Sequence, residues 1–246
     1  MGSIVSLTYD GKEFPAYLAQ PAGNIKGGII VIHEVWALND HTKNIADRYA
    51  SEGYVALAPN LLTMTDIAKY ADQLSLDLFN PEKRSEAQPK LRALMVPMQT
   101  EEFDTTTLAK LGTCFDYLYD MPDIQQNVAI TGFCFGGGYT YKMAIREPRL
   151  RAAVPFYGRA PLDSETLRKI TCPVLAFYGE NDQGLMKDLP ELEEKMHEAD
   201  VDFEAVVYPG CGHAFFNDTN PFAYNEHAAR DAWKRALGFL ERFIDG

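Results

Sequence analysis

One turn constrains the fold of this chain more than any other segment, because residues 132–136 (Gly-Phe-Cys-Phe-Gly) place a thiol between two glycines. The apolar run at 128–131 predicts a short buried strand before the turn, and residues 139–146 predict a helix after it. A strand, a tight turn with a central nucleophile and a helix form the pattern of a nucleophile elbow. The glycines let neighbouring backbone pass a strained turn without a Cβ in the way. Cys134 is therefore a candidate nucleophile.

Two other interpretations of this turn stay open. A free cysteine is commonly a small buried apolar residue with no chemical role. A glycine-rich turn can also bind phosphate, although this one lacks the Lys-Ser/Thr ending of a P-loop and the spacing of the dinucleotide fingerprint.

A nucleophile of this kind needs an acid and a base, which should follow it in that order on loops after late strands. The apolar run at 173–179 leads directly to Asp182. The alternating run at 203–208 leads into a glycine-rich loop that carries His213. Either residue alone would be an ordinary loop residue. Together, Asp182 and His213 occupy the positions expected for the acid and the base that accompany a nucleophile elbow.

Two backbone N–H groups are expected to bind the oxyanion, one after the nucleophile and one from the loop after the third strand. The run at 27–32 predicts that strand, and His33, Glu34, Val35 and Trp36 follow it. We assign the N–H groups of Phe135 and Val35 to the oxyanion hole. From the residues alone, Glu34 is a solvated loop carboxylate and His33 a structural residue.

These motifs together resemble the dienelactone hydrolase family, the branch of the α/β-hydrolases that uses a thiol nucleophile. The resemblance extends over nearly the whole chain. It is carried further by the following segments: Tyr9-Asp10-Gly11, Gly53-Tyr54-Val55-Ala56, Pro59-Asn60-Leu61 and Gly212-His213-Ala214-Phe215. It implies a catalytic triad of Cys134, His213 and Asp182, with Glu34 contacting the resting thiol and helping to remove its proton. The implied reaction is hydrolysis of an ester or lactone through a thioester, with no cofactor and no metal.

The chain departs from this resemblance where substrate charge is recognised. Members of the family resemble one another in holding a substrate carboxylate with two arginines. One of these arginines lies four residues after the catalytic histidine. That position here is Asn217, followed by Asp218, and neither can replace the charge-assisted bonds of an arginine. Arg84 or Arg92 could supply the second arginine, or both could be exposed helix charges. Trp36, Asn217, Arg84 and Arg92 are the candidate substrate-binding residues.

Other function classes fit less well but stay open. The nearest alternative is a carboxylesterase of broad specificity with promiscuous phosphotriesterase activity. A non-catalytic binding protein with the same fold would normally have lost a triad residue, and none is missing. A disulfide oxidoreductase would need a Cys-x-x-Cys pair, which the sequence lacks.

Strand-like and helix-like segments alternate along the chain, which predicts an α/β-hydrolase fold: a mostly parallel sheet of about eight strands with helices on both faces. The expected strands are 3–8, 14–20, 27–33, 54–58, 127–131, 152–157, 173–179 and 203–208. The expected helices are 41–52, 101–120, 137–147, 186–199 and 223–244. We expect a single domain over 1–246. Within it, residues 61–100 are expected to form helical excursions over the active-site edge, or else a surface insertion without function.

Composition limits the partners and the compartment. The net charge of −12 would repel the phosphate backbone of nucleic acids. No apolar stretch of ~18 residues predicts a membrane span, and no signal peptide is visible. The four cysteines form no metal spacing or disulfide framework, and the proposed thiol must stay reduced, so we expect a cytoplasmic protein. The expected partner is a small ester or lactone, and the expected assembly is a monomer or small homo-oligomer.

Overall fold

The computed structural model describes residues 2–63 and 65–244, and these form a single eight-stranded sheet in the order β1-β2-β4-β3-β5-β6-β7-β8. Its strands are β1 (Ser3–Tyr9), β2 (Lys12–Ala19), β3 (Gly27–Ile32), β4 (Tyr54–Pro59), β5 (Val128–Phe133), β6 (Ala152–Phe156), β7 (Val174–Gly179) and β8 (Phe203–Tyr208). The first two strands pair antiparallel with each other, and β2 pairs antiparallel with β4. All other pairs are parallel. The expected mostly parallel sheet of eight strands is confirmed.

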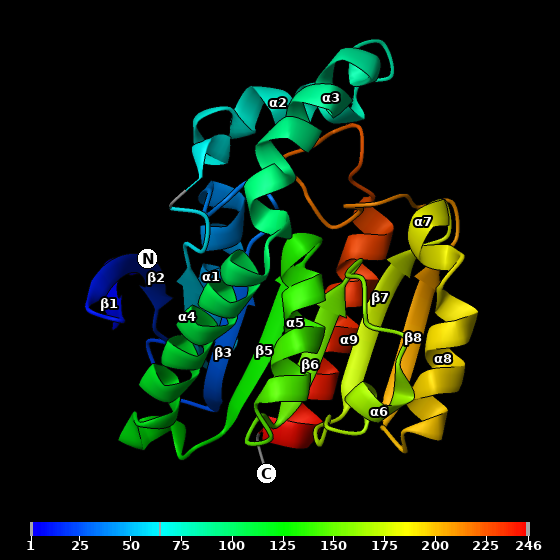
Figure 1. Cartoon of the computed structure of the whole chain (residues 1–246). Helices are drawn as coiled ribbons and strands as arrows, with labels where there is room; N and C mark the ends of the chain where they lie inside the picture. The colour runs from blue at the N-terminus through cyan, green and yellow to red at the C-terminus, as the bar shows by residue number, and fades with distance from the viewer. Residues whose placement is uncertain (1, 64, 245–246) are drawn as a thin grey trace.

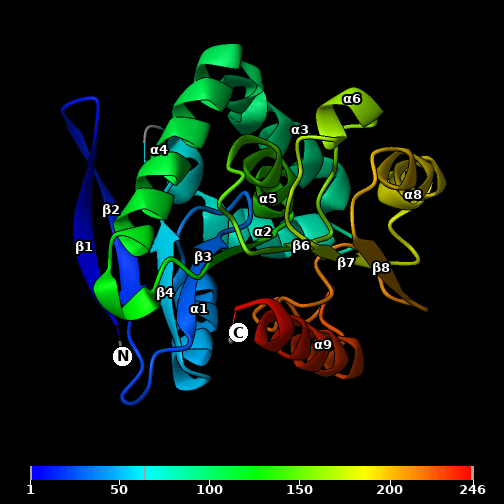
Figure 2. The same ribbon diagram turned by 90° about the horizontal axis from the view of Figure 1, so that it is seen from below.

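The central strands are apolar on both faces because helices cover both faces. Every residue of β3, β4, β5, β6 and β7 is buried. Figure 2 shows α1 (Asp40–Ser51) and α9 (Glu226–Ile244) below the sheet, with α4 (Glu101–Tyr119), α5 (Phe135–Arg146) and α8 (Leu189–Glu198) above it. The sheet is thus the middle of three layers.

The described residues also contain five short helical segments. They are η1 (Asp66–Lys69), η2 (Val96–Gln99), η3 (Pro122–Ile124), α6 (Ser164–Leu167) and α7 (Gln183–Met186). Local side chains start several of the helices: Asn39 accepts a hydrogen bond from the Thr42 N–H at the start of α1, and Thr100 accepts one from the Phe103 N–H at the start of α4.

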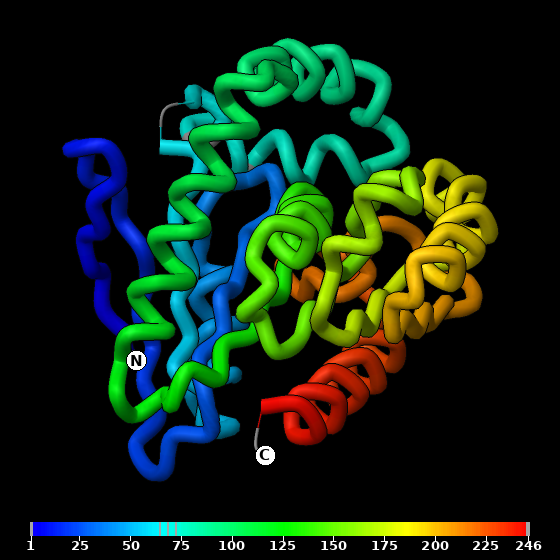
Figure 3. The backbone as a smooth tube through the Cα atoms, turned by 60° about the horizontal axis from the view of Figure 1, so that its bottom comes forward, coloured from blue at the N-terminus to red at the C-terminus, as the bar shows by residue number. Residues whose placement is uncertain are grey.

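The segment between β4 and α4 forms a helical layer of its own. It contains α2 (Ala71–Phe79) and α3 (Arg84–Met95), which lie above the sheet in Figure 1. Figure 3 traces this segment as it leaves β4, crosses the top of the molecule and returns into α4. The strands β3, β5, β6 and β7 run parallel, so their carboxyl ends meet at one edge, and the loops that carry the candidate site residues meet there too.

Candidate active site

Cys134 occupies the strained position of the turn between β5 and α5. Its backbone has φ 55° and ψ −110°, which an L-residue rarely adopts. Its N–H donates to the carbonyl oxygen of Phe156 at 3.0 Å, which fixes the turn to the neighbouring strand. The side chain is half-buried. Backbone strain of this kind persists only where the surrounding structure enforces it, which is typical of functional sites.

Glycine is required on both sides of this turn. A Cβ on Gly132 would collide with the carbonyl oxygen of Gly136, and a Cβ on Gly136 would collide with the carbonyl oxygen of Ile32. The start of α5 can therefore pack directly against the carboxyl ends of β3 and β5. This close approach brings Cys134 beside the loop that follows β3.

His213 and Asp182 meet across the carboxyl ends of β7 and β8. Asp182 Oδ2 lies 2.5 Å from His213 Nδ1, so the carboxylate fixes the orientation of the ring. Loss of solvation alone would lower the pKa of His213, but the negative charges of Cys134 and Asp182 raise it well above its ordinary value. The imidazole keeps 34% of its side chain exposed, so water can still reach it.

The loops that carry Asp182 and His213 are joined by hydrogen bonds. The Asn181 N–H donates to the Cys211 carbonyl oxygen at 2.7 Å, and the Gly210 N–H donates to Glu180 Oε2 at 2.8 Å. Glu180 is thus occupied by the neighbouring loop, and Asp188 pairs with Arg159. Of the carboxylates near this edge, Asp182 is the one that contacts the histidine.

Glu34 is not a solvated loop residue as the sequence alone suggests, since only 4% of it is exposed. Asn217 Nδ2 donates to Glu34 Oε2 at 2.7 Å, and the Tyr157 hydroxyl donates to Oε1 at 3.3 Å. The other end of the Asn217 amide accepts from Thr219 N and Oγ1 at 3.1 and 2.7 Å. Both ends of Asn217 are thus bonded within the protein, whereas the sequence analysis expects this residue at the substrate.

Tyr157 is a site residue that the sequence analysis missed. It follows β6 with φ 37°, it is 1% exposed, and its ring lies 5.1 Å from that of His213. Burial raises the pKa of Tyr157 well above its ordinary value, and the charges of Glu34 and Cys134 raise it further. The hydroxyl therefore stays protonated and acts as a donor. The one available signal was its place at the carboxyl end of a buried parallel strand.

His33 has the contacts of a structural residue. Its Nε2 accepts from the Leu61 N–H at 3.1 Å, so Nδ1 carries the proton and donates to the Glu34 carbonyl oxygen at 2.5 Å. Its ring stacks on Phe135 at 5.7 Å. Complete burial lowers the pKa of His33 to about 4, so the ring is neutral at neutral pH. These bonds hold the loop of Glu34 against the segment after β4.

The two N–H groups assigned to the oxyanion belong to residues that neighbour Cys134. Phe135 is the first residue of α5, and Val35 packs in the same apolar cluster as Cys134. Among the hydrogen bonds of the described residues, neither N–H has an acceptor within the protein. Both are free for an acceptor in the site, as an oxyanion hole requires.

The helical layer supplies an apolar wall to the site. Trp36 is 5% exposed, and Cys134 and Phe135 pack against the cluster that contains it. Its buried members are Val35, Trp36, Ala37, Leu62, Ile67, Ala71, Leu74 and Ala87. This wall joins the loop after β3 to α2 and α3, so residues 61–100 border the candidate site.

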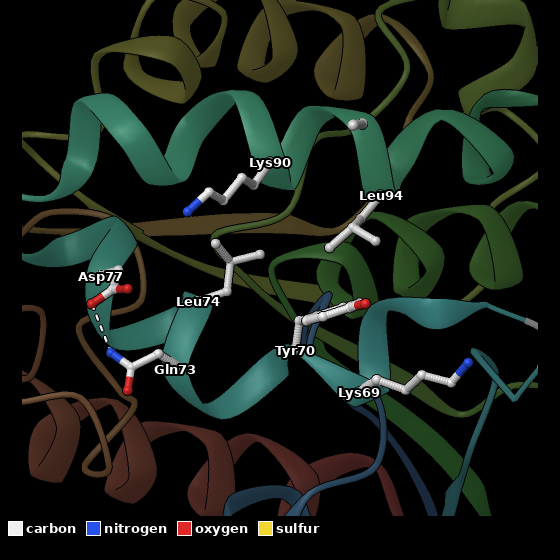
Figure 4. Close-up of a pocket in the computed structure, with 8 residues that line it drawn as sticks. Lys69, Tyr70, Gln73, Leu74, Asp77, Lys90 and Leu94 are labelled. Atoms are coloured by element: carbon white, nitrogen blue, oxygen red, sulfur yellow. Dashed lines mark hydrogen bonds between the residues drawn. The ribbon is translucent and has the colours of Figure 1, made fainter.

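A cavity of about 610 Å³ lies on the outer side of this wall, between α2 and α3. Figure 4 shows Leu74 and Leu94 pointing into it, with Lys90 and Tyr70 around them. No triad candidate lines this cavity. The exposed side chains of Arg84 and Arg92 do not line it either, and among the described residues neither arginine forms a hydrogen bond or an ion pair with Cys134, His213 or Asp182.

The four cysteines are free, and Cys134 differs from the others in exposure. Cys114, Cys172 and Cys211 are buried, and burial raises the pKa of each thiol, that of Cys172 to about 12. Those three thiols are protonated at neutral pH and shielded from reagents.

In residues 2–63 and 65–244, every helix is too short or too polar to cross a bilayer. The same ranges contain no cluster of three or more histidine, cysteine, aspartate or glutamate side chains placed to bind a metal ion.

Comparison with known proteins gave a consistent result. The model of the "Dienelactone hydrolase family" matches residues 14–244. The "Putative carboxymethylenebutenolidase" of Saccharolobus solfataricus is 36% identical over 251 residues, covering 95% of each chain. "Protein usf" of Aquifex pyrophilus is 30% identical over 249 residues, covering 99% of this chain and 100% of that protein.

Solved structures agree with these relatives. The crystal structure of a "Putative Dienelactone Hydrolase" from Klebsiella pneumoniae has a TM-score of 0.84 at 27% identity and covers 99% of each chain. A dienelactone hydrolase-like promiscuous phosphotriesterase from metagenomic libraries has a TM-score of 0.75 at 19% identity, covering 99% of this chain and 98% of that one. That identity shows the fold alone. Together with the strand order, these matches confirm the expected α/β-hydrolase fold.

Proposed function

Because the chain belongs to the dienelactone hydrolase family, we propose that it hydrolyses carboxylic esters or lactones through Cys134, His213 and Asp182. The observation that carries the proposal is that His213 interacts with both other residues, with Asp182 through its Nδ1 and with the side chain of Cys134 as a neighbour of the ring. A nucleophile, a base and a carboxylate that orients the base form the constellation used in acyl transfer.

The proposed reaction has two acyl-transfer steps. His213 takes the thiol proton, the thiolate of Cys134 attacks the carbonyl carbon, and the oxyanion is stabilised by the N–H groups of Phe135 and Val35. The tetrahedral species expels the alcohol, which receives the proton from His213, and leaves a thioester on Cys134. His213 then removes a proton from water, the water attacks the thioester, and the acid and the free thiol are released.

We propose that Glu34 assists the first proton transfer. It is a buried carboxylate in the loop after β3, and the charges of Glu34 and Cys134 both act on the hydroxyl of Tyr157. Its partners at Oε1 and Oε2 are the neutral donors Tyr157 and Asn217. No cation pairs with the carboxylate through these bonds, and each oxygen accepts one hydrogen bond, so each keeps a lone pair that could face the thiol of Cys134.

The proposed substrate is neutral and apolar close to its carbonyl group. The wall beside Cys134 consists of apolar residues, including Trp36 and Leu74. Asn217, at the position of the family's arginine, is occupied by Glu34 and Thr219. A substrate carboxylate would then lose a charge-assisted bond of about 1.5–3 kcal/mol.

We further propose that residues 1–246 act as one catalytic domain in a reducing compartment such as the cytoplasm. A continuous apolar core that includes Leu7 of β1 and Ile244 of α9 supports the first part. The four free thiols, one of them half-exposed, support the second.

A panel of substrates tests the proposed function. It contains p-nitrophenyl esters, a neutral lactone, cis-dienelactone and a neutral phosphotriester, each assayed with wild type and with Cys134→Ala. We expect neutral short-chain esters or lactones to be hydrolysed, and the variant to be inactive. Cys114→Ala is the matched control, because it removes a thiol that is buried in the core. Hydrolysis that survives Cys134→Ala would contradict the proposal, and turnover of the phosphotriester alone would replace it with phosphotriester hydrolysis.

A further inference from the structure

A second cavity lies apart from the candidate active site, between the β1–β2 hairpin, the segment after β4 and the start of α4. Its volume is about 420 Å³, and neither Cys134, Asp182 nor His213 lines it. Phe103 forms part of its wall and packs edge-to-face on Phe135 at 6.3 Å. Two aromatic rings therefore lie between this cavity and the turn that carries Cys134.

The unusual residue of this cavity is Lys110 on α4. It lines the cavity, yet it is only 8% exposed, and its Nζ lies 5.4 Å from the centre of the Phe14 ring. Among the described residues, no oxygen accepts a hydrogen bond from this ammonium. By contrast, the more exposed Lys43 and Lys83 pair with aspartates at 3.0 and 3.2 Å.

A largely buried ammonium without an anion is unfavourable, because it loses part of its hydration and gains only the face of the Phe14 ring in return. Loss of solvation lowers the pKa of Lys110, and the charge of Lys12 lowers it further, although Cys114 acts in the opposite direction. An anion bound in the cavity would supply the missing partner. It would form a charge-assisted hydrogen bond in a site partly shielded from water.

The other lining residues define which anion fits. Leu61 and Phe103 contribute apolar surface, and Thr107, 2% exposed, contributes a hydroxyl close to Lys110 on α4. Three carboxylates also line the cavity, all on exposed residues: Asp10, Glu13 and Glu102. They would repel a dianion such as phosphate more strongly than a singly charged group, so a single carboxylate close to Lys110 is the anion that fits better.

We propose that this cavity binds a small monocarboxylate with an apolar body, its carboxylate on Lys110 and its body against Leu61 and Phe103. The site is separate from the proposed hydrolytic centre and does not depend on it. A volume of this size falls within the range of ligand pockets for small molecules.

Benzoate is the probe that tests this proposal. Its binding is measured by calorimetry or ligand-observed NMR in a Cys134→Ala background, so that neither turnover nor the active thiol contributes. Lys110→Met keeps the length and apolar stem of the side chain and should weaken benzoate binding at least tenfold. Lys90→Met, an exposed lysine of the cavity between α2 and α3, is the matched control and should leave the affinity unchanged. Benzyl alcohol, which lacks the charge, should bind at least tenfold more weakly than benzoate.

Equal benzoate affinity in the Lys110→Met and Lys90→Met proteins would overturn the proposal, as would equal affinity for benzyl alcohol. A second measurement does not depend on a folded variant. Benzoate should slow the reductive methylation of Lys110 by formaldehyde and borohydride, followed by peptide mass spectrometry, and should leave that of Lys90 unchanged. Methylation of Lys110 that is indifferent to benzoate would show that its ammonium is simply solvated through the cavity.

Discussion

The hydrogen bond between Asn217 and Glu34 permits an energetic prediction. Nδ2 of Asn217 lies 2.7 Å from Oε2 of Glu34, and the two residues are 3% and 4% exposed. Asn217→Ala removes the donor from a buried carboxylate, and a hydrogen bond to a charged group contributes about 1.5–3 kcal/mol. For a chain of this length 1 kcal/mol shifts Tm by about 2–4 °C, so we expect Tm to fall by about 3–12 °C at neutral pH.

A double-mutant cycle separates this bond from the other bonds of Asn217, which also accepts from Thr219. Free energies of unfolding are measured in urea for wild type, Asn217→Ala, Glu34→Gln and the double variant. We expect a coupling of about 0.5–3 kcal/mol, as found for residues in one hydrogen-bond network.

Asn220→Ala is the matched control for the cycle. Asn220 is 1% exposed and bonds to Phe222 and Ser75 rather than to Glu34. Asn220→Ala should lower the free energy of unfolding. Its effect should simply add to the effect of Glu34→Gln, with no coupling between the two substitutions. A coupling between Asn217 and Glu34 no larger than that of this control would refute the role given to Asn217.

Three further predictions concern the site. Asp182→Asn should lower kcat by about 10²–10⁴-fold in steady-state assays while near-UV circular dichroism stays unchanged, since the carboxylate orients His213 rather than building the fold; normal turnover would place the acid elsewhere. The pKa of His33 is lowered from 6.5 to about 4 in the folded protein, so the unfolded chain takes up the proton first as the pH is lowered. The free energy of unfolding therefore decreases as the pH is lowered from about 6.5 to about 4. Between pH 7.5 and pH 4.5, the free energy of unfolding measured in urea should decrease by about 3 kcal/mol less for His33→Gln than for wild type. Equal decreases would mean that the His33 ring is not neutral in the folded state. In competition assays, neutral short-chain esters should have a higher kcat/KM than cis-dienelactone by roughly ten- to a hundredfold; a strong preference for the anion would require a cation at the site, such as Arg84 or Arg92.

The sequence predicted the sheet well because its central strands are buried on both faces and read as continuous apolar runs. The largest difference among those strands is at β5, expected to end at 131 and observed to end at Phe133. Hydrogen bonding to β6 continues to the turn, where Phe133 pairs with Phe156. The glycine residues at 132 and 136 suggested an earlier break, but they are needed for close packing rather than for ending the strand.

The helical layer was harder to delimit from the sequence. Pro89 lies within α3, which masks the helical pattern, and the apolar residues of α2 and α3 face a small cluster rather than the sheet. The sequence therefore indicated helical excursions at 61–100 but not the bounds of the two helices. Their packing against Trp36 depends on tertiary contacts.

The partners of Glu34 could not be found from the sequence. Asn217 lies 183 residues away along the chain and Tyr157 lies 123 residues away. Tyr157 belongs to no motif, and its φ of 37° is fixed by its surroundings and not by its residue type. Long-range hydrogen bonds of this kind have no local pattern, whereas the elbow, the acid loop and the histidine loop each do.

The central claim is that Cys134 carries the acyl group, and trapping that group tests it most directly. His213→Ala protein is mixed with p-nitrophenyl acetate, quenched in acid after a short time, digested and analysed by mass spectrometry. Removal of the base should slow hydrolysis of the thioester more than its formation from so activated an ester. We expect one acetyl group on Cys134, labile to hydroxylamine, and none on Cys114, Cys172 or Cys211. Acetylation of another residue, or turnover by wild type that persists after Cys134→Ala, would contradict the account.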